Sequence, residues 1–466
     1  MTDEWADSRL DLPRPLPARG RGEALRTELR AAIRSGRLPA GRRLPPSRIL
    51  AADLGVARNT VADAYGRLAA EGWLETLVGS GTRVAAGRSA DAAARTAAEQ
   101  PTPRLDLRPG HPDLSSFPRA AWSRAQAAAL ADTPATALGY DDPRGGLELR
   151  TTLAGYLARA RGVDADPHRI VLTTGFGDGV ASVWQLLVRE GARRLGVEEL
   201  SLPPFRRSAE AAGLELVPVP IDEQGADAAG VRADALLVTP AHQFPTGVVL
   251  SAERRRALGE RIAAGTLVVE DDYDGEFRFD RSPVGALQGL LPDGVVYTGT
   301  VSKTLAPGAR LGWLVVPERM ALPLAELRSE TGGAPSVIEQ RTLARLIDSG
   351  AYDHHVRRMR TLYRRRRDEL GMRLDAEGIR SRGIAAGLHV VVELPNGQGE
   401  EAVIARAADA GLALDGLAGY AMPGAARRPP SLVVGYGAPT PHLWPAALEA
   451  LAAVLAHGRP AASRTG

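Results

Sequence analysis

The sequence predicts an α/β protein, with a large lobe built on a mostly parallel sheet, a smaller α+β lobe after it, and a separate helical module in front. Three observations predict this organisation. Apolar runs alternate with helical stretches beyond residue 105, the pattern changes after Ser336 to a long Arg-rich helical region, and residues 85–104 are small, polar and interrupted by Pro. We therefore expect two folded parts, 15–84 and 105–460, joined by a linker at 85–104.

The expected strands of the body are short and apolar. Alternation of such strands with helices is typical of a parallel sheet, because each crossover returns the chain to the same edge. A long helical region covers 356–370 and continues beyond it, before the last strands. The strands expected in the large lobe are 170–173, 235–238, 266–269 and 295–297, and those in the smaller lobe are 389–394 and 431–434.

The front module begins with two helical patterns. Leu25, Leu29 and Ile33 recur at i, i+4 and i+8, which marks one buried face of a helix. A second, shorter helix fits 47–54, and Ser47 is expected to be its N-cap because it follows two prolines.

A third helix and a hairpin complete this module. The helix fits 58–71 after a turn at Gly55, and two short strands fit 73–84 around a Gly-rich tip. Two helices joined by a tight turn and followed by a hairpin form a winged helix-turn-helix, in which the second helix of the pair is slim enough to enter the DNA major groove.

Composition excludes several classes of protein. The chain has no Cys, so it can contain no disulfide, thiolate nucleophile or Cys-ligated zinc. Its eight His show no ligand spacing apart from the adjacent His354 and His355, so we expect no metal site. No apolar run approaches the ~18–20 residues of a membrane span, and the first residues lack the apolar core of a signal peptide. We expect an intracellular, cytoplasmic protein.

Charge is concentrated at the front of the chain. The net charge is only +3, but residues 1–88 carry 15 Arg against 10 Asp or Glu, whereas the remainder carries 43 basic and 45 acidic residues. A basic module on a near-neutral body is the asymmetry expected of a protein that binds nucleic acid.

The single lysine is the most informative residue of the body. Of the 58 basic residues, 57 are Arg, and the exception is Lys303. Arg replaces Lys well in ion pairs and phosphate contacts, but it stays protonated and cannot act as an amine nucleophile. Lys303 is therefore a candidate for covalent chemistry.

The third helix supplies candidate base contacts. Arg58 can bind guanine through two hydrogen bonds, Asn59 can bind adenine in the same way, and Thr60 usually contacts phosphate. Ser47 and Arg48 open the preceding helix, where backbone amides and a cation favour phosphate. At the wing tip the backbone can approach the sugar-phosphate chain, and the residues concerned are Gly79, Gly81 and Arg83.

These residues lie in a segment that resembles the GntR-type regulators. The segment is residues 43–84, RLPPSRILAADLGVARNTVADAYGRLAAEGWLETLVGSGTRV. The match covers both helices and the wing. The resemblance implies a double-stranded DNA operator as partner, contacted by Arg48, Arg58 and the glycines of the wing.

The surroundings of Lys303 also resemble a known motif. Residues 298–313 read TGTVSKTLAPGARLGW, which is similar to the lysine motif of class I aminotransferases, the fold-type I enzymes that depend on pyridoxal 5′-phosphate (PLP). The resemblance implies that Lys303 forms the aldimine with PLP, and that Thr300, Ser302 and Arg310 hold the phosphate.

The resemblance also places a carboxylate at the pyridine nitrogen, which keeps the ring protonated and electron-withdrawing. Residues 270–274 read Glu-Asp-Asp-Tyr-Asp and follow an expected strand. In the family this position carries the Asp, followed by a Tyr that touches the ring hydroxyl. We assign Asp271 and Tyr273, while Asp272 or Glu270 stays possible if the register differs by one residue.

Further cofactor contacts are expected in the first half of the body. Phosphate should lie at a helix N-terminus, and Gly175 and Phe176 follow the strand at 170–173. Phe205 is a candidate for stacking on the ring. Tyr140 matches a family tyrosine that reaches the phosphate across a dimer interface.

Two departures from the family pattern stand out. The Asn-Pro-Thr-Gly motif, whose Asn bonds the ring hydroxyl, is replaced by His-Gln-Phe-Pro-Thr-Gly at 242–247, so His242 or Gln243 would have to make that bond. The C-terminal arginine that binds a substrate carboxylate aligns with Val433. Arg427 and Arg428 lie nearby, in an expected loop, and Arg207 could offer one cationic contact to an effector.

A winged helix, a linker and an aminotransferase-like body, in that order, resemble the MocR-type subfamily of GntR regulators. The resemblance implies a homodimeric transcription regulator that senses PLP or an amino compound, with vitamin B6 or amine-metabolism genes as expected targets. The lack of a carboxylate-binding arginine favours PLP as the effector. The alternative is a catalytically active PLP-dependent aminotransferase with an appended DNA-binding domain.

Overall fold

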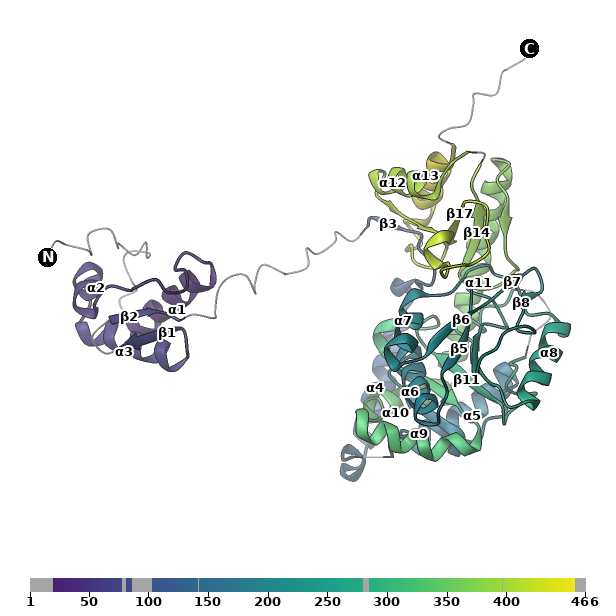
Figure 1. Ribbon diagram of the computed structural model, residues 1–466, viewed down its shortest axis with the longest axis horizontal. Helices are drawn as coiled ribbons and strands as arrows, with labels where there is room; N and C mark the ends of the chain where they lie inside the picture. Colours follow the sequence, from purple (N-terminus) through teal and green to yellow (C-terminus); the bar gives the residue numbers. More distant parts are fainter. Residues whose placement is uncertain are drawn as a thin grey trace, which may run out of the picture. The chain divides into compact units, whose positions relative to one another are not determined.

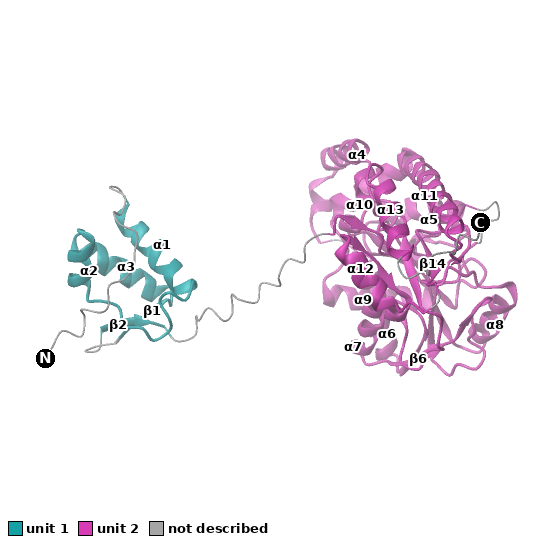
Figure 2. Cartoon of the chain, turned by 90° about the horizontal axis from the view of Figure 1, so that it is seen from above, with its two compact units in different colours: residues 1–102 teal, residues 103–466 magenta. Residues whose placement is uncertain are grey.

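The computed structural model describes residues 20–77, 81–85, 103–140, 142–279, 285–395 and 397–456. The chain divides into two compact units, residues 1–102 and 103–466 (Figure 2). Most of the expected linker at 85–104 lies outside the described residues. Within the described part, no helix is both long and apolar enough to cross a membrane.

The first unit contains three helices and a two-stranded hairpin. Its elements are α1 (Arg21–Arg34), α2 (Ser47–Leu54), α3 (Arg58–Ala70), β1 (Leu74–Leu77) and β2 (Gly81–Val84). The helical faces predicted from spacing do form the core, since Leu25, Leu29 and Ile33 are buried against Val61 and Leu68 of α3. Gly55 ends α2 with φ 63°, a left-handed conformation that glycine adopts without steric cost and that turns the chain into α3.

One boundary differs from the expectation. Ser47 is the first residue of α2, and Pro46 occupies the N-cap position without any side-chain capping bond. The N-cap residue has extended dihedrals, and Pro46 with its fixed φ supplies them (φ −53°, ψ 143°).

The hairpin is extended by a third short segment. The Leu44 amide donates to the Thr82 carbonyl at 2.8 Å, and the Val84 amide donates to the Arg42 carbonyl at 2.9 Å. Arg42 and Arg43 are therefore held beside the wing, although sequence patterns gave no reason to place them there.

The large lobe of the second unit is a seven-stranded sheet. Its neighbouring strands are parallel except at β12, which is antiparallel to both of its neighbours. The predicted strands at 170–173 and 235–238 have the observed bounds, and the others are longer by up to three residues. In sheet order the strands are β4 (Ile170–Thr173), β12 (Gly312–Val315), β11 (Val295–Thr300), β10 (Leu267–Asp271), β9 (Ala235–Val238), β5 (Arg194–Glu198) and β6 (Glu215–Val219).

Helices pack around this sheet, and a small hairpin extends beyond β6 (Figure 1). The apolar strand residues are buried against them in continuous clusters. The helices are α4 (Arg119–Asp132), α5 (Leu147–Arg161), α6 (Phe176–Arg189), α7 (Pro203–Ala212), α8 (Ala252–Ala263), α9 (Glu318–Thr331) and α10 (Val337–Asp348), and the hairpin is β7 (Ile221–Asp222) with β8 (Gly225–Ala226).

The small lobe has its own core, which buries one face of an antiparallel sheet. The strand β3 (Leu105–Asp106) pairs in parallel with β15 (Leu412–Ala413), so the second unit begins within this lobe. Sheet order is β13 (Ser381–Arg382), β14 (His389–Glu393), β17 (Ser431–Gly435) and β16 (Asp415–Gly416), and the helices are α11 (Ala351–Ala376), α12 (Glu400–Asp409) and α13 (Trp444–Ala456).

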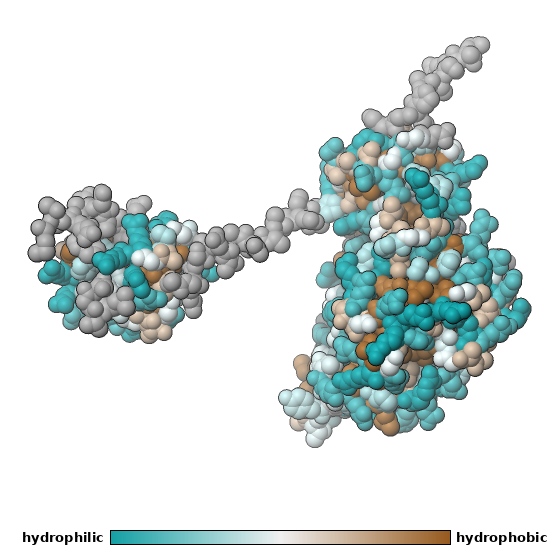
Figure 3. Space-filling view, viewed as in Figure 1, coloured by the Kyte–Doolittle hydropathy of each residue, from teal (hydrophilic) through white to brown (hydrophobic). Residues whose placement is uncertain are grey.

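The two lobes of the second unit meet along a partly open seam. On the face shown in Figure 3, apolar surface gathers between them, bordered by strongly hydrophilic side chains. A cavity of about 720 Å³ lies between the lobes. Apolar residues such as Ile221 and Val391 line it together with charged ones, which include Arg382, Glu393, Arg427 and Arg428.

Candidate functional site

The carboxyl ends of three neighbouring strands converge on the candidate cofactor site. β10 lies between β9 and β11 and runs parallel to both. The segments at or just after these strand ends carry His242, Asp271 and Lys303. In open α/β sheets, ligand sites form outside such strand ends. The structure thus brings three residues that are far apart in sequence to one edge of the sheet.

Two of the three consecutive acidic residues at the end of β10 have structural partners. Glu270 accepts hydrogen bonds from the backbone amides of Leu287 and Gln288, at 2.8 and 2.9 Å. Asp272 accepts two hydrogen bonds from Arg161, at 2.6 and 2.9 Å, in an ion pair whose side chains are only 1% and 4% exposed. Successive strand residues point to opposite faces, which separates Asp271 from both of them.

Asp271 instead lines a small cavity together with Phe205 and Arg206. Burial raises the pKa of Asp271 well above its usual value, and the neighbouring Asp272 raises it further, whereas Lys303 lowers it. Asp271 is half-buried and has no hydrogen-bond partner among the residues that the structure describes. Such a carboxyl is typical of a functional site, because it destabilises the fold until a ligand pairs with it. The open choice among Glu270, Asp271 and Asp272 is therefore narrowed by geometry to Asp271.

Replacing Asp271 or Asp272 by Asn is expected to affect the free energy of unfolding differently. Asp272→Asn is expected to lower the free energy of unfolding by about 3–5 kcal/mol, because it leaves Arg161 buried without its counter-charge. Asp271→Asn should leave stability unchanged or raise it near neutral pH. Its carboxyl has a raised pKa in the folded state, so its ionisation above the unfolded pKa opposes folding. Urea unfolding of both variants tests this, and a large loss of stability in Asp271→Asn would contradict it.

Lys303 follows β11 and is held in place by a backbone acceptor. Its Nζ donates to the Gly110 carbonyl at 2.7 Å. Burial lowers the pKa of the Lys303 amine, whereas Asp271 and Asp274 raise it, and burial is the larger effect. A lowered pKa increases the fraction of free amine near neutral pH, which is what an amine nucleophile requires.

A helix N-terminus faces the site beside an arginine. Gly175 is the N-cap of α6 with φ 126°, and no side chain caps the amides that follow it at Phe176 and Gly177. Arg310 has φ 50°, the left-handed conformation, and its Nη2 lies 3.4 Å from Thr174 Oγ1. Uncapped amides, a helix dipole and a guanidinium together suit a phosphate.

The two hydroxyls predicted to hold the phosphate lie together. Thr300 Oγ1 and Ser302 Oγ are 2.7 Å apart. Thr300 also donates to the Leu311 carbonyl at 3.1 Å, so its proton is used internally. The bond between the two hydroxyls is then donated by Ser302, so Ser302 can donate to a ligand only by giving up its bond to Thr300.

An aromatic side chain stands between this helix terminus and Asp271. Phe205, near the start of α7, packs edge-on against Phe176 with ring centroids 4.5 Å apart. The same side chain lines the cavity with Asp271. A flat ring beside the carboxylate and the helix terminus is the arrangement that the sequence predicted for a stacking partner.

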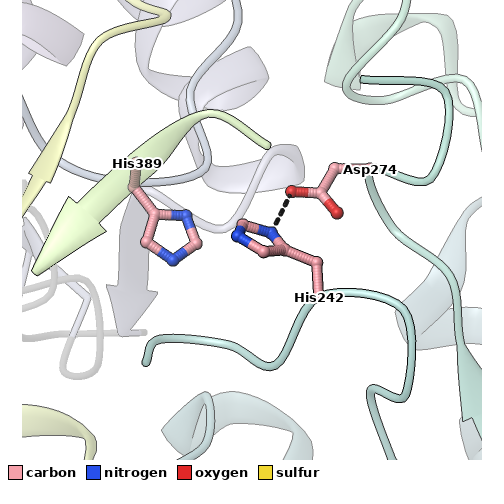
Figure 4. Close-up of side chains that lie close together, drawn as sticks. All are labelled: His242, Asp274 and His389. Atoms are coloured by element: carbon pink, nitrogen blue, oxygen red, sulfur yellow. Dashed lines mark hydrogen bonds and ion pairs between the residues drawn. The ribbon is translucent and has the colours of Figure 1, made fainter. Parts of the chain in front are cut away.

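Tyr273 belongs to a buried polar cluster. Its hydroxyl lies 2.9 Å from His242 Nδ1, which in turn lies 2.8 Å from Asp274 Oδ2. Burial raises the pKa of Tyr273 well above its usual value, so the phenol is a proton donor. His389 of the small lobe packs beside His242, and burial lowers its pKa to about 3 (Figure 4).

The hydrogen bonds of His242 and Gln243 indicate which of the two could bond the ring hydroxyl of PLP. Gln243 donates to Glu198 and to the Leu200 carbonyl, each at 3.0 Å, and its oxygen accepts from Thr246. Its amide is used by Glu198 and Leu200 at the end of β5 and by Thr246 of its own loop, so Gln243 has no free donor for the ring hydroxyl in this arrangement. His242, in contact with Tyr273, is left as the candidate.

The position of the missing arginine is apolar. Val433 is fully buried on β17 in a cluster with Phe244, Tyr273 and Tyr420. Arg428, which is close in sequence, donates to Glu199 at 2.9 Å and to the Ile221 carbonyl at 2.7 Å.

Two other predicted contacts are placed away from the pocket. Arg207 is exposed, and its neighbour Arg206 lines the cavity instead, because residues adjacent on a helix point about 100° apart. The contact of Arg207 with an effector stays a prediction, and Arg207 does not line this cavity. Tyr140 is fully exposed in the single chain, with Leu138 exposed beside it.

The predicted DNA-contacting residues of the first unit differ in their exposure to solvent. Arg58 and Asn59 are exposed at the start of α3, and Arg48 is exposed on α2. Thr60 is half-buried near Gly22, and Ser47 is half-buried.

The wing adds arginines that the sequence did not single out. Gly79 lies outside the described residues, and Gly81 begins β2. Arg83 is engaged by Glu75, with Nη2 and Oε2 3.2 Å apart. Arg42 and Arg43 are exposed next to it. Their place on a third wing segment is a tertiary contact, which helix and strand patterns cannot reveal.

Two family models match the chain. The model of the bacterial regulatory proteins of the gntR family matches residues 21–84, and that of aminotransferase class I and II matches residues 105–416, more than half of the chain. The chain belongs to the MocR-type GntR regulators. The chain is therefore a transcription regulator with an aminotransferase-like domain.

Curated relatives agree with this membership. The MocR-type chain is 35% identical to the HTH-type pyridoxine biosynthesis transcriptional regulator PdxR of Corynebacterium glutamicum, over 85% of this chain and 88% of the relative. It is 37% identical to the probable rhizopine catabolism regulatory protein MocR of Rhizobium meliloti, over 73% of this chain and 74% of the relative.

Solved structures show the fold of the body of this MocR-type regulator. An archaeal alanine:glyoxylate aminotransferase matches with a TM-score of 0.68 at 22% identity, covering 75% of this chain and 90% of its own. The α-aminoadipate aminotransferase LysN of Thermus thermophilus, solved with N-(5′-phosphopyridoxyl)-L-leucine, matches with a TM-score of 0.66 at 23% identity, covering 75% and 91%. The second unit therefore has the fold-type I aminotransferase fold.

Proposed function

We propose that this regulator binds PLP covalently through Lys303 and that occupancy of this site changes how its winged helices bind DNA. The observation that carries the proposal is the position of Lys303. The one lysine of the chain lies near the Asp271 carboxyl, which lines a cavity with the flat ring of Phe205. That ring packs against Phe176 at the N-terminus of α6, beside Arg310. These are the groups that an aldehyde, a pyridine ring and a phosphate require.

The chain's own residues divide the work of binding. Lys303 Nζ supplies the amine, Asp271 a carboxylate for the pyridine nitrogen, and Phe205 a stacking surface. Ser302, Arg310 and the amides after Gly175 suit the phosphate. When bound, PLP supplies an electron sink and a chromophore, and the protein supplies orientation and electrostatics.

PLP itself is the proposed effector. The apolar cluster around Val433 offers no cation for the carboxylate of an amino acid, whereas the groups suited to the cofactor are present. The name of the Corynebacterium relative, which refers to pyridoxine biosynthesis, supports the same effector class. We propose vitamin B6 genes as the targets.

A dimer fits this proposal. Tyr140 and Leu138 are exposed near α4, and Leu130 on that helix is exposed as well. Large exposed apolar side chains that gather in one region are typical of an interface. The matching tyrosine of the aminotransferase family reaches the partner's phosphate, so we propose that Tyr140 completes the pocket of a second copy.

Aminotransferase turnover is the second candidate function. The pocket that suits PLP favours it, and the apolar surroundings of Val433 oppose it. Half-transamination separates the two, because an active enzyme would lose the absorption band of the lysine adduct rapidly when mixed with a panel of amino acids.

The proposed function is tested by effector-dependent DNA binding. The full chain first selects its operator from a random-sequence library, and PLP is then titrated into the labelled complex. We expect the DNA affinity to change by about 5–150-fold, the range typical of coupled sites, with a changed footprint. Affinity and footprint that stay the same at saturating PLP would contradict the proposal, and pyridoxine 5′-phosphate, which lacks the aldehyde, is the matched control ligand.

A further inference from the structure

Two histidines from different lobes face each other in the second unit. His242 lies in the loop after β9 of the large lobe, and His389 is the first residue of β14 in the small lobe. Their ring centroids are 5.1 Å apart, and their side chains are only 3% and 1% exposed. Figure 4 shows the two rings facing each other, with Asp274 on the far side of the His242 ring.

Each ring is held by a hydrogen bond on one nitrogen. His242 Nδ1 lies 2.8 Å from Asp274 Oδ2, and His389 Nε2 lies 3.1 Å from the Pro245 carbonyl oxygen. A carboxylate and a carbonyl can only accept, so these two nitrogens carry the protons. The Tyr273 hydroxyl, 2.9 Å from His242 Nδ1, then accepts at that nitrogen and keeps its own proton for another acceptor. The remaining nitrogens, His242 Nε2 and His389 Nδ1, then carry lone pairs.

Both of these lone-pair nitrogens are buried without a hydrogen-bond partner among the described residues. A buried acceptor left unpaired costs about 1–3 kcal/mol, and here two of them lie in neighbouring rings. Within the part of the chain that the structure describes, His242, Asp274 and His389 also form a group whose potential ligand atoms lie within 4.8 Å of one another. The arrangement calls for a positive or proton-donating species between the rings.

We propose that His242 Nε2 and His389 Nδ1 bind a divalent late first-row metal ion such as Zn²⁺, which thereby links the two lobes. The ion takes the remaining nitrogen of His242, so in this proposal Tyr273, and not His242, contacts the ring hydroxyl of PLP. Imidazole nitrogen is a preferred ligand of Zn, Cu and Ni. The other nitrogen of a metal-bound histidine almost always donates to a carboxylate or a backbone carbonyl, and Asp274 and Pro245 supply one of each.

The site leaves coordination positions for other ligands. Two imidazoles fill half of a tetrahedral shell, so two water molecules or small ligands would complete it, one more than in the usual catalytic zinc site with three protein ligands. Asp274 provides a negative charge next to His242, which offsets part of the charge of a buried dication. Gly387 (φ 74°) allows the small lobe to approach, because a side chain there would collide with His242 and Asp274.

Sequence spacing could not reveal this pair. The two histidines are separated by 147 positions, and only the packing of β14 against the loop after β9 makes them neighbours.

The test titrates Zn²⁺, and Co²⁺ as a coloured probe, into the untagged full-length protein freed of PLP. We expect one ion per chain and a cobalt absorption spectrum of nitrogen ligation. His242→Phe and His389→Phe should each remove this binding, while Asp274→Asn should weaken it about 10–100-fold through the lost orientation of His242. The exposed His354, replaced by Phe, is the matched control and should bind as the wild type does.

The proposal would be overturned if the wild type bound no stoichiometric metal. It would also be overturned if both histidine variants still bound one ion per chain. Absence would mean that a bridging water satisfies the two lone pairs instead. The titration uses protein without PLP, so its outcome is separate from that of the PLP experiment. Because a variant could misfold, the cobalt spectrum of the wild type and thermal unfolding of each metal-free variant are recorded alongside.

Discussion

Replacing Lys303 by arginine is expected to abolish covalent capture of PLP while leaving the fold and effector-free DNA binding intact. The guanidinium keeps its proton in water and cannot condense with an aldehyde. The chain already accommodates 57 arginines, so the change adds no foreign side-chain type. We expect complete loss of borohydride-trapped adduct and loss of the PLP effect on DNA affinity.

The measurement compares wild type and Lys303→Arg by absorbance and by intact mass after borohydride reduction. Arg310→Ala is the matched control, because it removes a proposed phosphate contact but keeps the amine. We expect Arg310→Ala to need more PLP and still to form the adduct at saturation. Lys303→Gln provides a second, uncharged test, since the longer arginine could by itself disturb the neighbourhood of the Gly110 carbonyl. A retained adduct in either lysine variant would show that another group captures the aldehyde.

Arg58→Ala is expected to weaken operator binding by about 1–3 kcal/mol, roughly 5–150-fold, and to relax specificity at one base pair. The side chain is exposed at the first position of α3, where a recognition helix meets base edges. Its loss should leave the unfolding transition unchanged, because it has no part in the core of the first unit.

The control for Arg58 lies on the same helix. Arg67 is exposed in the last turn of α3 and pairs with Asp63 at 3.1 Å, so Arg67→Ala removes the same charge away from the proposed contact. Binding is measured at two or more salt concentrations on the selected operator and on an unrelated fragment. Equal weakening by both variants, without a change of base preference, would mean that Arg58 contributes only general charge attraction.

Local patterns predicted much of the fold. Helical spacing of Leu25, Leu29 and Ile33 identified a core face because such spacing depends only on neighbouring residues. Strands such as 170–173 and 235–238 were found from their apolar runs, since both faces of the sheet are buried. Ser47 was misplaced by one position, because Pro46 also satisfies the N-cap geometry.

The site was harder to predict where contacts between distant segments determine which side chains are left for a ligand. Asp271 could be separated from Glu270 and Asp272 only after Arg161, Leu287 and Gln288 were seen to hold the other two. For the same reason the sequence could not tell that the Gln243 amide is used by Glu198 and Leu200, more than 40 positions away.

Side-chain direction and long-range packing account for the remaining differences. Arg206 and Arg207 are equivalent in the sequence, and only the orientation of α7 distinguishes them. Arg42 and His389 gained their significance from segments that are distant along the chain. No local pattern contains that information.

Covalent binding of PLP by Lys303 is measured most directly by peptide mapping of the full-length protein after incubation with PLP and reduction with borohydride. We expect a single modified peptide, with the pyridoxyl phosphate group on Lys303, the one lysine side chain available. An unmodified position 303 in protein that has bound PLP would contradict covalent capture, and the regulator would then have to sense its signal by another route.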